Sequence, residues 1–162
     1  MRLILIFVLS VFLCTQTNSR LQDGCLQTAD LVGNLPNFTG TVQPCSYSGF
    51  APLDNDNNSA LFYWYFPNQQ GNKDAPLLIW LQGGPGSSSL WGMLTEYLGP
   101  FSVIPNEEGG YSLDYNDKDG GMSWSYFYDI IFIDNPVGTG YSYTATEKYP
   151  TNLDDVILSL LF

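Results

Sequence analysis

The order of apolar and polar positions is most informative around a five-residue apolar run, Leu77–Leu81. The run is followed by Gln82 and a turn that contains Gly83, Gly84, Pro85 and Gly86. An unbroken apolar run is typical of a strand that is buried on both faces, as in a parallel sheet. The turn cannot continue the strand, because proline lacks an N–H and glycine adopts backbone conformations that are closed to other residues. The pattern predicts a buried strand that ends in a glycine-rich loop, where backbone N–H groups can point at a ligand.

Three further strands are predicted by runs of strand-forming residues. Ser46–Phe50 and the aromatic-rich Ala60–Phe66 come before the central run, on either side of a loop rich in Asp and Asn. Asp129–Asp134 is a second buried strand of the parallel type. Like Leu77–Leu81, it ends in a turn rich in glycine and proline, and sites in open α/β sheets form at such carboxyl ends. The sequence therefore predicts an α/β fold with a site at these two turns.

One complete helix is predicted over Ser87–Leu98. Serine hydroxyls can cap its start, leucine and methionine recur at helical spacing, and Gly99-Pro100 ends it. The segment Phe101–Ser125 is predicted to be irregular. A second helix is expected over Thr151–Phe162, and because the chain ends there on an apolar run without a stop signal, we expect the chain to be incomplete.

Composition narrows the possible functions. The chain has 162 residues, enough for one domain with a hydrophobic core, and 44% of them are hydrophobic. The formal net charge of −11 argues against binding to nucleic acid or to anionic membrane surfaces, both of which need clustered Lys and Arg. The sequence has no histidine, so a complete histidine-dependent catalytic triad is impossible within it.

Residues 1–19 are predicted to be a cleaved secretory signal peptide. Arg2 is followed by an apolar run that is too short to span a bilayer comfortably, and no membrane attachment is expected after cleavage. Secretion places Cys25 and Cys45 in an oxidising compartment, where they can form a disulfide with each other. The alternative is that one or both pair with residues outside this chain.

Two Asn-x-Ser/Thr sequons, at Asn37 and Asn57, fit the same compartment. The second lies in Leu53–Ser59, an Asp/Asn-rich stretch that indicates an exposed loop. We therefore favour glycosylation at Asn57 over Asn37.

Three kinds of site could use the glycine-rich loop. A phosphate-binding loop needs a lysine after its glycines, and Ser87–Ser89 provides none. A dinucleotide site needs Gly-x-Gly-x-x-Gly, but Ser89 stands at the place of the third glycine. The third is an oxyanion hole, in which backbone N–H groups after a buried strand stabilise the negative charge that develops during acyl transfer. The order of strand, loop and helix favours the oxyanion hole, which implies no cofactor and no metal.

The motifs resemble those of the serine carboxypeptidases, whose fold is that of the α/β-hydrolases. Trp80–Ser89 is similar to the signature loop of this family, Glu96–Phe101 to the acidic-Leu-Gly-Pro stretch that follows it, and Asp134–Tyr143 to the next motif. Tyr47–Phe50 and Leu61–Trp64 fit the early strands. The resemblance covers nearly all of residues 20–162 and implies the N-terminal portion of a mixed, mostly parallel sheet, truncated relative to a full member.

The resemblance also implies roles for individual residues. Gly84 would supply an oxyanion-hole N–H. Gln82 and the Gly83 N–H would hold the C-terminal carboxylate of a peptide substrate. Glu96 would share a hydrogen bond with a second carboxyl outside this chain, in a pair that favours acidic pH because two close carboxylates cannot both ionise. Trp91 would line the pocket for the released residue.

Two residues depart from the usual family pattern. Gln82 stands where most members have Asn, and Ser87 stands where many have a disulfide-bonded cysteine. The Gln variant resembles the vitellogenic-like and retinoid-inducible branches, so it is compatible with activity. The Gly-Glu-Ser-Tyr nucleophile segment and the later Asp and His of the family are absent from this sequence.

The resemblance implies a serine carboxypeptidase of the secretory pathway, in a lysosome or vacuole or outside the cell, that removes single residues from peptide C-termini through an acyl-enzyme. Residues 20–162 alone would be inactive. The alternatives are a secreted, non-catalytic, truncated paralogue and a carboxypeptidase-like acyltransferase. If the family's strand order holds, the strand that pairs with the outer edge of Leu77–Leu81 lies outside this sequence, and we expect the open edge to promote aggregation.

Overall fold

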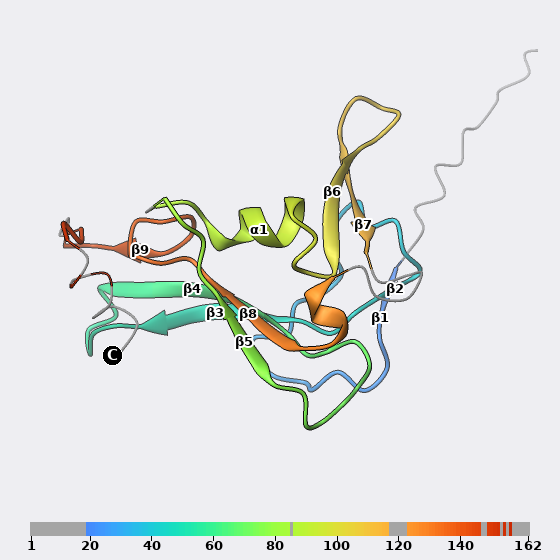
Figure 1. Ribbon diagram of the computed structural model, residues 1–162, viewed down its shortest axis with the longest axis horizontal. Helices are drawn as coiled ribbons and strands as arrows, with labels where there is room; N and C mark the ends of the chain where they lie inside the picture. Colours follow the sequence, from blue (N-terminus) through green and yellow to red (C-terminus); the bar gives the residue numbers. More distant parts are fainter. Residues whose placement is uncertain are drawn as a thin grey trace, which may run out of the picture.

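The computed structural model describes residues 19–84, 86–116, 123–146, 149–152, 154 and 156. Residues 1–18 of the predicted signal peptide and most of the predicted C-terminal helix lie outside these residues. The described part is organised around one sheet with the strand order β3-β4-β8-β5, to which β9 adds by pairing with β4 (Figure 1). The strands of this sheet are β3 (Tyr47–Pro52), β4 (Ser59–Phe66), β5 (Leu77–Trp80), β8 (Asp129–Ile133) and β9 (Tyr143–Thr144).

The sheet is mixed, as predicted, although most pairings among its described strands are antiparallel rather than parallel. β4 runs antiparallel to β3, β8 and β9, whereas β5 and β8 are parallel, with Trp80 opposite Phe132. Among the described strands of this sheet, parallel pairing is confined to β5 and β8. The carboxyl ends of these two strands therefore lie side by side, as the sequence predicted.

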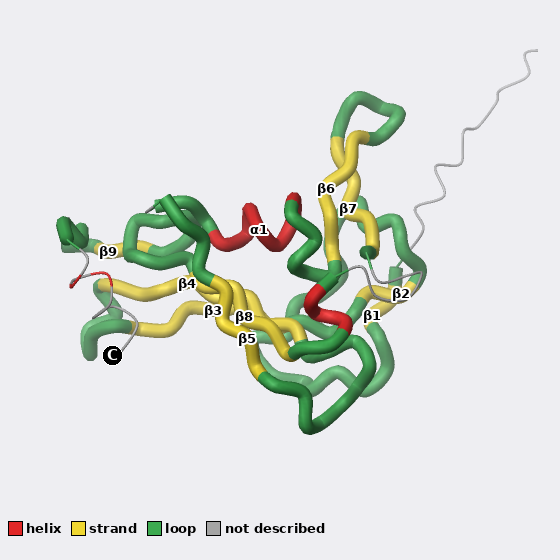
Figure 2. Tube along the Cα trace, in the orientation of Figure 1, coloured by secondary structure: helices red, strands yellow, loops and turns green. Residues whose placement is uncertain are grey.

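Helix α1 (Ser89–Thr95) lies over one face of the sheet (Figure 2). It is shorter than predicted at both ends, since Ser88 is its N-cap and Glu96 its C-cap. Its buried side contacts the start of β6 and the face of β8, and belongs to the same core cluster as residues of β4. The buried core cluster consists of Phe38, Phe66, Met93, Leu98, Phe101, Ile130 and Phe132.

The prediction that Leu77–Leu81 is buried on both faces is wrong for this structure. Leu78 and Trp80 face α1 and are half-buried, but Ile79, on the other face, is 61% exposed. In the described part of the chain β5 pairs with β8 alone, so its other edge is open. An unbroken apolar run indicates that both faces of the strand are apolar, but it does not show whether another element covers each face.

The prediction that Phe101–Ser125 is irregular is also wrong. β6 (Phe101–Pro105) and β7 (Tyr111–Tyr115) form an antiparallel hairpin that projects away from the sheet in Figure 1, and η1 (Trp124–Tyr126) is a short 3-10 helix. The hairpin turn is closed by Asn106, whose Oδ1 accepts from the Gly110 N–H at 2.8 Å. Gly109-Gly110, in the segment that was predicted to be irregular, is therefore part of a hairpin turn.

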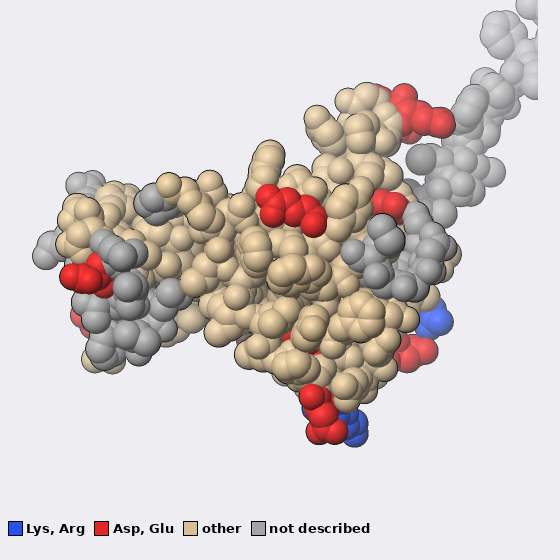
Figure 3. Space-filling model, in the orientation of Figure 1, with Lys and Arg blue, Asp and Glu red and all other residues tan. Residues whose placement is uncertain are grey.

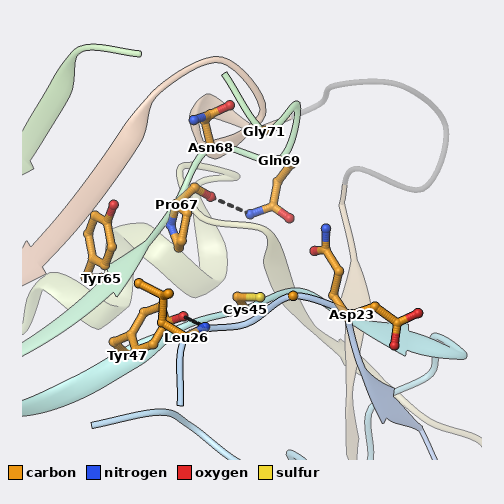
Figure 4. Close-up of a pocket in the computed structure, with 11 residues that line it drawn as sticks. Asp23, Leu26, Cys45, Tyr47, Tyr65, Pro67, Asn68, Gln69 and Gly71 are labelled. Atoms are coloured by element: carbon orange, nitrogen blue, oxygen red, sulfur yellow. Dashed lines mark hydrogen bonds between the residues drawn. The ribbon is translucent and has the colours of Figure 1, made fainter. Parts of the chain in front are cut away.

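The N-terminal segment is attached by the disulfide between Cys25 and Cys45, which confirms the first of the two predicted pairings. Its short strands β1 (Arg20–Leu21) and β2 (Val42–Gln43) pair in parallel. A pocket of about 310 Å³ lies beside this segment, at Pro67, the residue directly after β4 (Figure 4). Tyr47 and Tyr65 line it, and the amides of Asn68 and Gln69 at its rim are bonded to protein groups.

Candidate functional site

The candidate site lies where the parallel strands β5 and β8 end. The loop after β5 leads through the glycines into α1, and the turn after β8 returns the chain toward β9. Both turns were predicted to meet at this edge of the sheet. The candidate site and the pocket at Pro67 lie at opposite ends of the sheet. The pocket follows the carboxyl end of β4, and β4 runs antiparallel to β8.

Gln82 is oriented by a neighbour on β5. The indole Nε1 of Trp80 donates to Gln82 Oε1 at 2.9 Å. Gly92 of α1 packs against this pair, since a Cβ there would lie 2.8 Å from Trp80 Nε1 and 2.9 Å from Gln82 Oε1. With its oxygen held by the indole, the Gln82 amide keeps its N–H groups for another acceptor, and they make no hydrogen bond to a described residue.

Gly83 and Gly84 carry backbone N–H groups that are not used within the described part of the protein. Both residues are exposed, and neither N–H has a hydrogen-bond partner among the described residues. Gly84 has φ +133°, a conformation that L side chains rarely adopt, which explains why a glycine stands there. The loop therefore has two available N–H groups directly after Gln82 in the chain.

Two serines fix the loop to the start of α1. The Ser88 hydroxyl accepts from the Leu90 N–H at 3.2 Å, as the predicted N-cap should. The Ser89 hydroxyl accepts from the Gln82 N–H at 3.1 Å and donates to the Ile133 carbonyl. Ser89 is buried, so this hydroxyl joins the ends of β5, β8 and α1 at one point.

Asp134 is the residue of this site that the sequence reasoning did not single out. Its side chain is only 1% exposed, and its carboxylate accepts from Ser88 Oγ at 2.7 Å, the Ser89 N–H at 2.8 Å and the Tyr141 N–H at 3.0 Å. These donors replace water around a buried negative charge. An acidic residue that directly follows an apolar strand was the available signal.

Trp91 and Glu96 lie on α1, away from the loop glycines. Trp91 is in the first turn of the helix and is 62% exposed. Glu96 is the C-cap at the other end, exposed, and its side chain makes no hydrogen bond to a described residue. A helix of this length places its ends roughly 10 Å apart. Gln82, Gly83 and Gly84 are consecutive in the chain, and among the described residues no hydrogen bond joins the side chains of Glu96 or Trp91 to them.

The two sequons differ in their surroundings. The Asn37 amide donates to the Tyr111 carbonyl at 3.3 Å, and the next residue, Phe38, is buried in the core. Asn57 lies in the loop between β3 and β4, exposed, with no side-chain hydrogen bond to a described residue. Glycosylation at Asn57 rather than Asn37 stays a prediction, and these contacts agree with it.

Other kinds of site find no support in the described ranges. They contain no group of three or more His, Cys, Asp or Glu side chains that could hold a metal ion. No helix among the same residues is long and apolar enough to cross a membrane. The face in Figure 3 is mainly uncharged, with acidic side chains in small separate groups and few basic ones.

Comparison with known proteins identifies the class to which this fold and loop belong. The model of the family "Serine carboxypeptidase" matches residues 36–160, so the chain belongs to the serine carboxypeptidase family. It is 46% identical over 112 residues to the vitellogenic carboxypeptidase of Aedes aegypti, an alignment that covers 68% of this chain and 22% of that protein. It is 43% identical over 116 residues to the probable serine carboxypeptidase CPVL of Homo sapiens, covering 71% of this chain and 22% of that protein.

A solved structure supports the same assignment. The crystal structure of a prohormone-processing carboxypeptidase from Saccharomyces cerevisiae superposes with a TM-score of 0.58 at 33% identity, over 73% of this chain and 26% of that one. The described residues thus match the N-terminal portion of the α/β-hydrolase fold of this family, which confirms the predicted family and fold class. The chain spans about a fifth of the length of the curated relatives that it matches.

Proposed function

We propose that this chain supplies the substrate-binding loop of a serine-type carboxypeptidase that removes single residues from peptide C-termini through an acyl-enzyme. The observation that carries the proposal is the grouping of available donors at the end of β5. The side-chain NH₂ of Gln82 and the backbone N–H groups of Gly83 and Gly84 are adjacent in sequence and make no hydrogen bond to a described residue, and the three residues are exposed or half-buried. Donors held ready in this way suit an anionic ligand.

The three donors would divide between two negative groups of the substrate. The Gln82 amide and the Gly83 N–H would hold the C-terminal carboxylate, which selects the end of a peptide over its interior. The Gly84 N–H would donate to the carbonyl oxygen of the scissile bond as that oxygen becomes an anion. Losing one such oxyanion donor costs about 3 kcal/mol of transition-state stabilisation, so the position of Gly84 matters to rate more than to binding.

Glu96 and Trp91 would act from α1. Glu96, exposed at the end of the helix, is available to a second carboxyl from outside this chain, with which it would share a proton at acidic pH. Trp91, exposed in the first turn, would pack against the residue to be released.

The catalytic nucleophile and base would come from outside these residues. The sequence has no histidine, and a serine nucleophile needs a neighbouring base. Residues 20–162 alone would therefore be inactive. The disulfide between Cys25 and Cys45 agrees with a location in the secretory pathway. We further propose that Asn57 carries a glycan, so that Asn57→Gln lowers the glycosylated mass of the secreted protein while Asn37→Gln leaves it unchanged.

The test uses the protein encoded by the native transcript, called here the native protein, alongside residues 20–162. We expect the native protein to release single C-terminal residues from peptides, as followed by mass spectrometry, and a serine-directed sulfonyl fluoride to stop the release. Residues 20–162 should release none. A native protein that binds peptides without cleaving them would instead support a non-catalytic role, and transfer of an acyl group to an acceptor other than water would support an acyltransferase.

A further inference from the structure

Asp134 has a buried carboxylate without a cation beside it. The side chain is 1% exposed, and no Lys or Arg of the described residues lies within ion-pair distance. Its neutral donors are the Ser88 hydroxyl, the Ser89 N–H and the Tyr141 N–H. Burying a charge in this way is costly unless the hydrogen bonds are complete. The buried carboxylate is therefore stabilised by hydrogen-bond donors from two separate stretches of the chain.

These stretches are the two turns of the candidate site. Ser88 and Ser89 belong to the start of α1, directly after the glycine-rich loop, and Tyr141 belongs to the turn after β8. The backbone of Asp134 is itself fixed to the sheet, since its N–H donates to the Phe62 carbonyl at 3.0 Å. One side chain thus attaches both turns to the rigid strands.

The turn after β8 is built closely around this carboxylate. A Cβ added at Gly140 would lie 2.0 Å from Asp134 Oδ2, and Gly140 has φ +53°. A residue with a side chain would therefore have to displace the carboxylate or the backbone. The glycine permits the close approach that brings the Tyr141 N–H to Asp134.

The glycine-rich loop is held at both of its ends. Before the glycines, the Gln82 N–H donates to the Ser89 hydroxyl at 3.1 Å. After them, Ser88 and Ser89 bind Asp134. Gly83 and Gly84 lie between these attachments and make no hydrogen bond of their own to the described residues. Their position is therefore set by Ser88 and Ser89, and through them by Asp134.

We infer that Asp134 is a positioning residue, which orients the Gly83 and Gly84 N–H groups by anchoring the start of α1 to the turn after β8. The inference rests on the proposed function for the role of those N–H groups. An Asn at this position has the same shape but keeps only one acceptor oxygen, and its NH₂ would face one of the donors. One of the two connections that Asp134 makes, either to the start of α1 or to the turn after β8, would then be lost.

A matched control lies on the same strand. Asp129, the first residue of β8, accepts from the Asn68 N–H at 2.8 Å, from Asn68 Nδ2 at 2.9 Å and from the Tyr65 hydroxyl at 3.0 Å. It makes a similar number of hydrogen bonds, but at the end of the strand away from the loop. Asp129→Asn therefore removes an equivalent acceptor without touching the site.

The experiment compares Asp134→Asn with Asp129→Asn in the native protein by two readouts. The first is hydrogen exchange of the backbone amides of residues 82–90, which does not depend on catalysis. We expect Asp134→Asn to speed exchange there at least tenfold, and Asp129→Asn to leave it within twofold of wild type. The second readout is kcat for release of a C-terminal residue, which should fall at least tenfold in Asp134→Asn and stay within twofold in Asp129→Asn, because an oxyanion contact is made mainly in the transition state.

The two readouts separate the inference from the proposed function. Equal exchange at residues 82–90 in the two variants, or an unchanged kcat in Asp134→Asn, would overturn the positioning role. A wild-type protein without carboxypeptidase activity would refute the proposed function, and the exchange comparison would then decide the positioning role by itself. If Asp134→Asn does not fold, Ser88→Ala replaces it, with the exposed neighbour Ser87→Ala as its control.

Discussion

The Ser89 N–H donates to Asp134 Oδ1 at 2.8 Å, and this bond joins the first residue of α1 to the residue directly after β8. The two residues are far apart in sequence, yet they hold together the two turns that follow the parallel strands. A negative charge at the start of a helix is also favourable because of the helix dipole. Buried polar contacts thus fix the ends of the glycine-rich loop, while the Gly83 and Gly84 N–H groups make no hydrogen bond to a described residue.

Gly140→Ala should destabilise the protein, because a Cβ at this position would meet the Asp134 carboxylate at 2.0 Å and the φ of +53° is strained for alanine. We expect the free energy of unfolding to fall by about 1–3 kcal/mol. Urea unfolding of the native protein measures it. Gly33→Ala is the control, since nothing lies within 4 Å of a Cβ there and its φ is not positive. Equal stabilities of the two variants would show that the turn is not built around the carboxylate.

Gln82→Leu should weaken substrate binding more than it slows the chemical step. It removes the amide that would bond the substrate carboxylate and also the acceptor of the Trp80 indole. A hydrogen bond to a charged group contributes about 1.5–3 kcal/mol, so KM for a peptide should rise on the order of tenfold to a hundredfold. Steady-state kinetics of the native protein measure it, with Gln69→Leu, at the rim of the other pocket, as the control. An unchanged KM in Gln82→Leu would exclude this residue from the carboxylate clamp.

Tyr65 makes stability sensitive to alkaline pH. Burial, together with the hydrogen bond to Asp129 and the negative charge of that carboxylate, raises the pKa of Tyr65 to about 12 from an ordinary value of 10.0. Because the folded pKa is the higher one, the contribution of the neutral phenol to stability is complete below about pH 10 and is lost as the pH rises toward 12. The free energy of unfolding should therefore fall less steeply between these pH values in Tyr65→Phe than in wild type. Identical slopes in the two proteins would contradict this assignment.

The open edge of β5 should make residues 20–162 self-associate when they are produced alone. β5 pairs only with β8 in the described part of the chain, and its outward residues Leu77 and Ile79 are exposed. We expect concentration-dependent association in sedimentation velocity, and Ile79→Lys should reduce it while leaving the circular dichroism spectrum unchanged. Leu78→Lys, on the face that packs against the core, should instead disrupt the fold. A monomeric, cooperatively melting wild-type chain would show that the edge is not a site of association.

Much of the main sheet could be predicted from the sequence because its strands are marked by local pattern. The runs at Ala60–Phe66 and Asp129–Asp134 differ from β4 and β8 by one residue at one end. The exposure of Ile79 could not be predicted, because burial depends on which elements cover a face and not on the strand itself. The β6–β7 hairpin was missed because its strands alternate only weakly between apolar and polar residues, while the glycines of its turn favoured a prediction of irregular structure.

The part of the site that depends on backbone conformation could be predicted from the sequence. The glycines and the proline after Leu81 indicate a loop with available N–H groups, and the serines indicate the helix cap, so Gln82, Gly83 and Gly84 were found. Asp134 was not, since an acidic residue after an apolar strand is only a weak local signal and does not reveal that the residue will bind a serine 45 positions earlier. Glu96 and Trp91 depend on partners outside the described residues, and their roles stay predictions.

We propose that the Gln82–Gly84 loop recognises a free peptide C-terminus. A direct test compares kcat/KM of the native protein for two peptides that differ only in their C-terminus, one a free acid and the other an amide. We expect the free acid to be processed at least a hundredfold more efficiently, because two of the three loop donors would hold its carboxylate. Equal processing of the two peptides, or no processing of either, would contradict it.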